Sequence, residues 1–170
     1  MSNLLDLCTP DSTTRLGPCA EVRVGEHVTR YVRRGTGSSV VVVGADAQAS
    51  PVWSPLVDQL VASHRVVVPQ PPAPGADIGG WLRGFIEGIG LTAIVLIAGG
   101  AAATASLDLA ASDDFTIRRL VLLPTAGDNH HTPGSTSRGE DQIAADRTLW
   151  VLPEWSTPDS LQRIESFISA

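Results

Sequence analysis

The sequence predicts an α/β protein with a mostly parallel, doubly wound sheet that begins with an antiparallel hairpin. Short apolar runs rich in β-branched residues alternate with segments of helical periodicity, which is the pattern of strands covered by helices on both faces. A chain of 170 residues with 43% apolar and 18% charged residues can form one hydrophobic core. We therefore expect a single domain over residues 19–170, preceded by a loose arm over residues 1–18.

The hairpin is predicted by two segments that alternate apolar and polar side chains. Residues 20–24 and 27–33 show this alternation, and Gly25-Glu26 between them supplies a two-residue turn. Alternation predicts strands that are each half exposed.

Cys8 and Cys19 lie at this end of the chain, and we expect both to be reduced thiols.

Uninterrupted apolar runs predict the central strands. Residues 39–43 and 64–68 contain consecutive valines and leave no polar face, so both should be buried strands. Residues 53–62 and 78–89 carry apolar side chains at helical spacing, and glycines weaken the second of these helices. The proline cluster over residues 69–74 forces an extended loop before it.

The stretch over residues 92–106 is the centre of the predicted sheet. Its apolar run leads directly into Gly99-Gly100 and then into a helix of small residues, which predicts a buried strand, a tight turn and a closely packed helix. Three further elements complete the chain. They are strands over residues 117–123 and 147–152, separated by a long polar loop, and an amphipathic helix over 158–169 with Thr157 as its N-cap.

Charge and hydropathy exclude several classes of partner. The net charge is −6, all 12 basic residues are arginines, and no basic run offers a surface for nucleic acid or for an anionic membrane. The N-terminus lacks the pattern of a signal peptide, and the longest apolar window, over residues 93–105, is too short to span a bilayer. We expect a cytoplasmic protein without a membrane segment, a cofactor or a metal.

The order and spacing of these elements resemble the α/β-hydrolase family over about residues 22–167. The resemblance rests on the segments 31–44, 53–60, 64–69 and 120–123. It implies that residues 98–102, Ala-Gly-Gly-Ala-Ala, occupy the position of the nucleophile elbow, the strand-turn-helix corner on which this family presents a serine. We call residues 98–102 the elbow.

The sequence departs from the family pattern at each catalytic position. Gly100 stands where the elbow serine is expected, and residues 152–156, where the family has its histidine loop, contain no histidine. Gly44-Ala45 replaces a His-Gly pair, and Gln70 replaces an aspartate. The interval between Leu123 and the last strand is too short for a cap and a further strand-helix unit. The chain therefore resembles a trimmed, cap-less hydrolase without its nucleophile and base.

Ligands of doubly wound sheets bind at the carboxyl ends of the strands, so the loops at that rim hold the candidate site. Backbone N–H groups near Ala101 and after Val43 are suited to an anion or oxyanion pocket; alternatively, the glycines only allow close packing. The residues expected to line the pocket are Gly44, Ala45, Asp46, Gly99, Gly100, Ala101 and Trp155.

Four residues on this rim are candidates for acid-base chemistry. Asp128, His130 and His131 follow a central strand, and Glu154 lies where the family places its histidine loop. A histidine beside a carboxylate can transfer protons near neutral pH without a covalent intermediate. Three ligands within four residues would crowd one metal ion, so we do not expect a metal site there. The alternative is a solvated polar loop.

These observations favour a non-hydrolytic enzyme, a cyclase, isomerase or lyase, that acts on an acyl or polyketide-like small molecule. The first alternative is an inactive pseudo-hydrolase that binds a ligand or partner protein, expected as a homodimer because a missing structural unit exposes apolar surface. The second is a hydrolase with a displaced nucleophile, such as Ser50 or Ser156.

Overall fold

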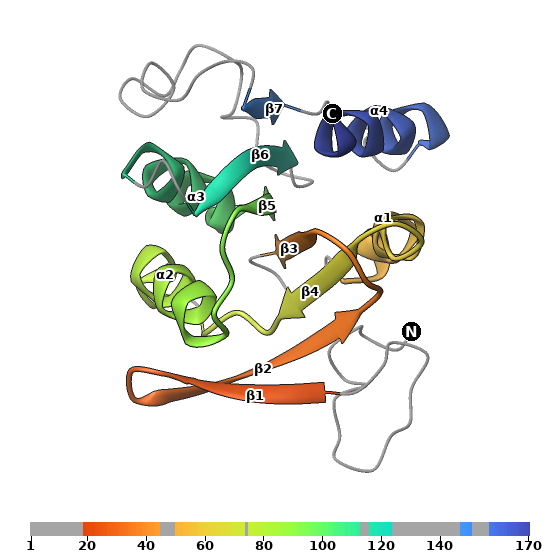
Figure 1. Cartoon of the computed structure of the whole chain (residues 1–170). Coiled ribbons are helices and arrows are strands. Elements are labelled where there is room, and N and C mark those ends of the chain that lie inside the picture. The colour runs from red at the N-terminus through yellow and green to blue at the C-terminus, as the bar shows by residue number, and fades with distance from the viewer. Residues whose placement is uncertain (1–18, 45–49, 74, 113–115, 124–146, 151–156) are drawn as a thin grey trace.

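The computed structural model describes residues 19–44, 50–73, 75–112, 116–123, 147–150 and 157–170. Within these ranges the chain forms a seven-stranded sheet with four helices packed against it (Figure 1). The strands are β1 (Cys19–Val24), β2 (His27–Arg34), β3 (Ser39–Gly44), β4 (Arg65–Pro69), β5 (Ile94–Gly99), β6 (Ile117–Leu123) and β7 (Thr148–Trp150). The helices are α1 (Ser50–Leu60), α2 (Ile78–Gly88), α3 (Ala101–Ser112) and α4 (Pro158–Ser169).

The strand order is β1-β2-β4-β3-β5-β6-β7. Strand β2 runs antiparallel to both of its neighbours, β1 and β4, whereas the pairs from β4 through to β7 are all parallel. The prediction of a mostly parallel sheet with an N-terminal antiparallel hairpin is therefore confirmed. Gly25 adopts a φ of 59° at the first turn position of the hairpin, where a two-residue turn favours glycine.

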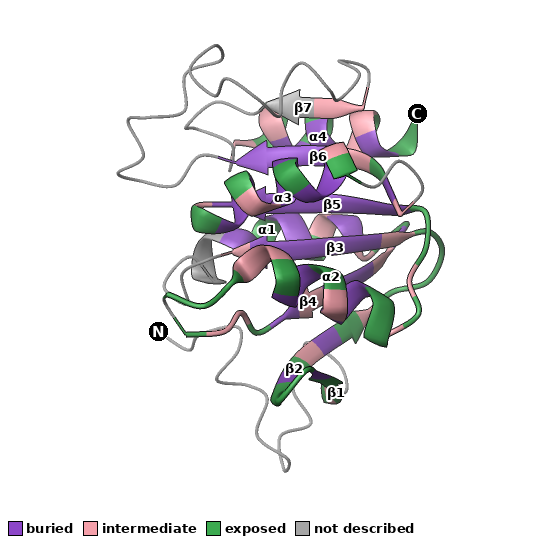
Figure 2. Ribbon diagram, turned by 90° about the vertical axis from the view of Figure 1, so that its left-hand side faces the viewer, coloured by how far each residue is buried: buried purple, intermediate pink, exposed green. Residues whose placement is uncertain are grey.

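Helices cover both faces of the sheet, as a doubly wound architecture requires (Figure 1). The four consecutive valines of β3 show why no polar face is possible. Val41 and Val43 pack in a hydrophobic cluster with side chains of α2 and α3, while Val40 and Val42 pack in a second cluster with side chains of α1 and α4. Figure 2 shows the central strands buried and the β1-β2 hairpin largely exposed.

The ends of α2 and α4 are set by local hydrogen bonds. The Asp77 carboxylate accepts from the Gly80 N–H at 3.0 Å and caps the start of α2. Gly90, with a φ of 67°, ends the same helix, and the Leu91 N–H donates to the Ile86 carbonyl in a Schellman arrangement. Thr157 caps α4, as the sequence predicts.

Glycines in α2 position the hairpin. An added Cβ at Gly84 would lie 2.8 Å from a methyl carbon of Val24, and one at Gly88 would lie 2.9 Å from a methyl carbon of Val22. Both distances are too short for real contacts, so only glycine lets α2 lie this close to β1. The glycines that lower the helix propensity of α2 therefore allow a close helix-strand contact.

Some predicted details are corrected. His64 precedes β4 instead of belonging to it, and it is buried with its Nδ1 2.8 Å from the Ser63 hydroxyl oxygen. Helix α1 begins earlier than expected, at Ser50. Cys19 is disulfide-bonded, so the expectation of a reduced thiol is wrong for this residue. Among the described residues, no helix is both long and apolar enough to cross a membrane.

Candidate functional site

The elbow has the predicted backbone geometry. Strand β5 ends at Gly99, Gly100 turns the chain with a φ of 62°, and α3 begins at Ala101. The Gly100 carbonyl accepts from the Ala103 N–H at 2.9 Å, which makes the turn as tight as the sequence indicates. A left-handed φ of this kind is strained for any residue that has a Cβ, and glycine removes that strain. The corner is therefore preserved while its apex carries no side chain.

The indole of Trp53 fills the space beside the elbow. Gly44 and Gly99 are register partners on β3 and β5, and Trp53 of α1 lies against both. An added Cβ would lie 3.2 Å from Nε1 of Trp53 at Gly44 and 2.9 Å from its Cζ2 at Gly99. These two glycines therefore allow Trp53 to pack closely on the strands. For Gly99, close packing is the alternative role that the sequence left open. Sequence reasoning placed Trp53 on a helix face and missed this contact, because periodicity does not reveal which strand a helix covers.

Much of the predicted site lies outside the described residues. This applies to the pocket residues Ala45, Asp46 and Trp155 and to the acid-base candidates Asp128, His130, His131 and Glu154. Their grouping on the rim remains a prediction. On α3, the Ser106 hydroxyl is fully buried and has no hydrogen-bond partner among the described residues, so it points into the core and not toward a ligand.

A groove of about 480 Å³ lies between α2 and α3 and begins at the elbow. Ala101 and Thr104 line it from α3, and Asp77 lines it at the start of α2. Arg83 crosses it and donates from Nη2 to the Ser112 hydroxyl at 2.9 Å. Of the residues expected to form the rim pocket, Ala101 is thus the one placed beside an open volume of ligand size.

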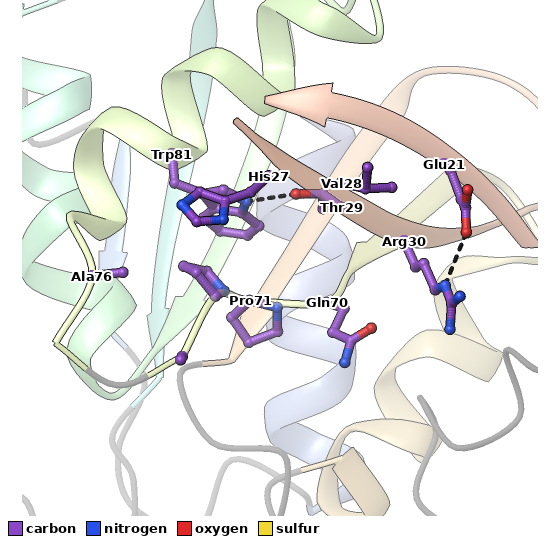
Figure 3. Close-up of a pocket in the computed structure, with 11 residues that line it drawn as sticks. Glu21, His27, Val28, Thr29, Arg30, Gln70, Pro71, Ala76 and Trp81 are labelled. Atoms are coloured by element: carbon purple, nitrogen blue, oxygen red, sulfur yellow. Dashed lines mark hydrogen bonds and ion pairs between the residues drawn. The ribbon is translucent and has the colours of Figure 1, made fainter. Parts of the chain in front are cut away.

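A second cavity, of about 420 Å³, lies where the start of β2 meets the end of β4 and the start of α2 (Figure 3). We call it the hairpin cavity; its lining residues are Glu21, His27, Val28, Thr29, Arg30, Gln70, Pro71, Pro72, Ala73, Ala76 and Trp81. The sequence analysis did not identify it. Its signals were the proline cluster after β4 and the alternation of β2, but neither pattern shows that residues about fifty positions apart come together.

Two aromatic contacts fix the walls of the hairpin cavity. Trp81 donates from Nε1 to the Thr29 hydroxyl oxygen at 2.9 Å in a buried hydrogen bond. The Trp81 ring stacks on Phe85 with centroids 5.9 Å apart, and Tyr31 meets Phe85 edge-on at 5.5 Å. The hydrogen bond between Trp81 and Thr29 and the edge-on contact between Tyr31 and Phe85 join α2 to β2, whereas the Trp81–Phe85 stack lies within α2 and orients the indole that lines the cavity.

The described residues contain no group of three or more His, Cys, Asp or Glu side chains that could hold a metal ion. The loop with Asp128, His130 and His131 lies outside that search. The described part of the site therefore provides backbone N–H groups at the start of α3, small side chains and two open volumes.

Solved structures with a similar architecture include epoxide hydrolases and a haloalkane dehalogenase. No protein-family model and no curated protein sequence matches this chain. An epoxide hydrolase from Vigna radiata superposes with a TM-score of 0.55 and 18% identity, over 67% of this chain and 42% of that one. The Cif epoxide hydrolase from Acinetobacter nosocomialis gives a TM-score of 0.56 and 20% identity, over 75% of this chain and 45% of that one.

A haloalkane dehalogenase from Agrobacterium tumefaciens matches with a TM-score of 0.55 and 14% identity, over 62% of this chain and 40% of that one. The chain spans less than half the length of each of these three structures. The likeness shows that the chain has a shortened α/β-hydrolase fold, as the resemblance in the sequence implied.

Proposed function

We propose that this shortened α/β-hydrolase fold binds an acyl or polyketide-like small molecule at its carboxyl rim and acts on it without hydrolysis. The observation that carries the proposal is Gly100 at the apex of a well-formed elbow. Hydrolases of this fold attack their substrates with a side chain presented at that point. A glycine there has no group with which to form a covalent intermediate, so the proposed reaction proceeds by proton transfer and by shaping of the substrate.

The proposed roles follow from the predicted positions of the rim residues. Backbone N–H groups at Ala101 and Ala102, in the unpaired first turn of α3, would bind a carbonyl or enolate oxygen of the ligand. Asp128 would orient His130 or His131, and that histidine or Glu154 would remove or return a proton. This set of groups suits a cyclisation, an isomerisation or an elimination, none of which needs a serine.

A fluorophosphonate probe tests the absence of a serine nucleophile. We expect no labelling of this protein under conditions that fully label an active serine hydrolase used as the control. Labelling at Ser50 or Ser156 would show a displaced nucleophile and would overturn the proposal. Gly100→Ser should remain unlabelled as well. Residues 152–156, where the family has the histidine that activates its serine, contain no histidine.

Substitution of the histidines tests whether the protein is an enzyme. Once a ligand has been found by NMR screening of acyl and polycyclic compounds, His130→Ala or His131→Ala should lower turnover by about 10²- to 10⁴-fold and leave binding intact. Arg33→Ala is the control, since Arg33 is an exposed residue of β2 that lines neither described cavity. Ligand binding without any turnover would instead support the inactive pseudo-hydrolase.

A further inference from the structure

The hairpin cavity shares no lining residue with the elbow or with the predicted rim pocket. It opens because β2 is longer than its neighbour β4. The pairing of the two strands ends at Tyr31 and Pro69, and Pro71 and Pro72 then turn the chain away from β2. Residues 27–30 of β2 therefore border an open volume where a longer β4 would lie. Its 420 Å³ falls within the range of small-molecule sites.

The edge of β2 offers a backbone donor to this volume. The Arg30 carbonyl accepts from the Gln70 N–H at 2.8 Å, so the backbone groups of Arg30 point toward the β4 side of the strand. Antiparallel strands direct the backbone groups of alternate residues to the same side. The Val28 N–H therefore points to the same side, beyond the end of the β2-β4 pairing.

One wall of the hairpin cavity is apolar. Trp81 is held by its hydrogen bond to Thr29, and Pro71 and Pro72 face the cavity from the loop after β4. Val28, which precedes Thr29 in β2, is 54% exposed and directs its side chain to the opposite face of the strand. The apolar wall that a ligand body would cover is therefore made by Trp81, Pro71 and Pro72.

The other edge carries side chains that bind anions. Arg30 donates from Nε to Glu21 at 2.9 Å, and its two terminal nitrogens make no hydrogen bond to any described residue. Figure 3 shows Arg30 and Gln70 on the same edge of the cavity. Their guanidinium and amide groups are donors that suit a carboxylate. The Glu21 carboxylate, next to Arg30, disfavours ligands with more than one negative charge.

We propose that the hairpin cavity binds a small amphipathic monocarboxylate. Its carboxylate accepts hydrogen bonds from the terminal nitrogens of Arg30, from the Gln70 amide and from the Val28 N–H. Its apolar body lies against Pro71, Pro72 and Trp81. This site is independent of the proposed rim function, because neither the elbow nor the loop with Asp128 takes part.

Two-dimensional NMR titration of the full chain tests the proposal, with 2-naphthoate as the probe. We expect saturable shifts of the Val28, Arg30 and Gln70 amides, whereas those of Gly100 and Ala101 stay unchanged. Uncharged 2-naphthylmethanol should bind at least tenfold more weakly, because it lacks the carboxylate. Inorganic phosphate should bind weakly too, because Glu21 repels a dianion and phosphate has no apolar body.

Arg30→Gln should weaken 2-naphthoate at least tenfold, while Arg30→Lys should keep most of the affinity. Arg33→Gln is the matched control, since Arg33 is an exposed arginine on the same strand that does not line the cavity. If Arg30→Gln and Arg33→Gln weaken 2-naphthoate binding equally, the effect reflects general charge attraction, and the proposal is overturned. Shifts centred on the elbow, equal binding of the neutral alcohol, or no binding at millimolar probe would also overturn it. The outcome of this titration does not affect the fluorophosphonate test of the rim function. Either proposal can therefore be overturned while the other stands.

Discussion

The elbow and the hairpin cavity lie at the carboxyl ends of two strands of one sheet, yet they are built from opposite kinds of residue. At the elbow, Gly99, Gly100 and Ala101 carry no side chain beyond a methyl group, and Trp53 occupies the adjacent space. At the hairpin cavity, Arg30 and Gln70 leave donors free for a ligand beside an apolar wall. At the elbow, Trp53 packs against the strand ends Gly44 and Gly99 and leaves open only the groove beside Ala101, whereas the hairpin cavity is left open by a mismatch in strand length.

This difference shows that packing and backbone conformation favour glycines at the elbow. Gly99 leaves room for Trp53, and Gly100 adopts the positive φ of the turn without the strain that a side chain would add. Substitutions in the two regions should therefore differ in how strongly they change the free energy of unfolding.

Gly99→Ala should lower the free energy of unfolding by about 2 to 3 kcal/mol, because overpacking displaces the indole and the strand. The added Cβ would lie 2.9 Å from Cζ2 of Trp53 and 3.3 Å from the Leu123 carbonyl oxygen. Gly25→Ala is the control at the hairpin turn. There φ is 59° but no atom lies within 4 Å, so only the backbone cost of about 1 kcal/mol should appear. Urea unfolding measures the free energy of unfolding of both variants. Equal decreases for Gly99→Ala and Gly25→Ala would show that the elbow is not tightly packed.

Thr29→Val should lower the free energy of unfolding by about 1 to 2 kcal/mol, because it leaves the Trp81 N–H buried without an acceptor. Valine has nearly the shape of threonine, so the loss reports the hydrogen bond. Thr29→Ser is the control, because it keeps the hydroxyl, so its tryptophan emission maximum should not move. In Thr29→Val the emission maximum should shift. An unchanged emission spectrum in both variants would contradict the proposed role of this bond in holding the cavity wall.

Ser106→Ala should leave the free energy of unfolding unchanged or raise it by up to about 1 kcal/mol, since a buried hydroxyl without a partner destabilises the fold. Ser112→Ala is the matched control on the same helix. Its hydroxyl accepts from Arg83 and donates to the Leu109 carbonyl, so its removal should be slightly destabilising. Thermal unfolding of the two variants in parallel gives the sign of each effect. A clear loss for Ser106→Ala would mean that this hydroxyl has a partner.

Glu21→Gln should change the free energy of unfolding by less than about 0.5 kcal/mol, because an exposed ion pair contributes little. The Arg30 and Glu21 side chains are 50% and 56% exposed. Added salt should reduce even this small difference. A loss above about 1 kcal/mol would show that Arg30 is committed to stability and is not available to a ligand.

Much of the fold could be predicted because its signals are local. The alternation of β2, the valine run of β3, the apolar run before Gly99 and the Thr157 cap each specify an element within a few residues. The elbow was predicted for the same reason, since its glycines and its helix adjoin in the chain. The disulfide state of Cys19 was predicted wrongly, because composition reports a cellular compartment only indirectly.

The sequence by itself determined that this chain forms a doubly wound sheet and that the apex of its elbow has no nucleophile, because hydrophobic periodicity and residue identity are local properties. Only the tertiary structure decided that Trp53 packs on Gly44 and Gly99 and that Thr29 and Trp81, 52 residues apart, close one wall of a cavity. Contacts of this kind depend on how far each strand extends beside its neighbour and on which helix covers it. Those relations arise when the sheet assembles, so no local pattern encodes them.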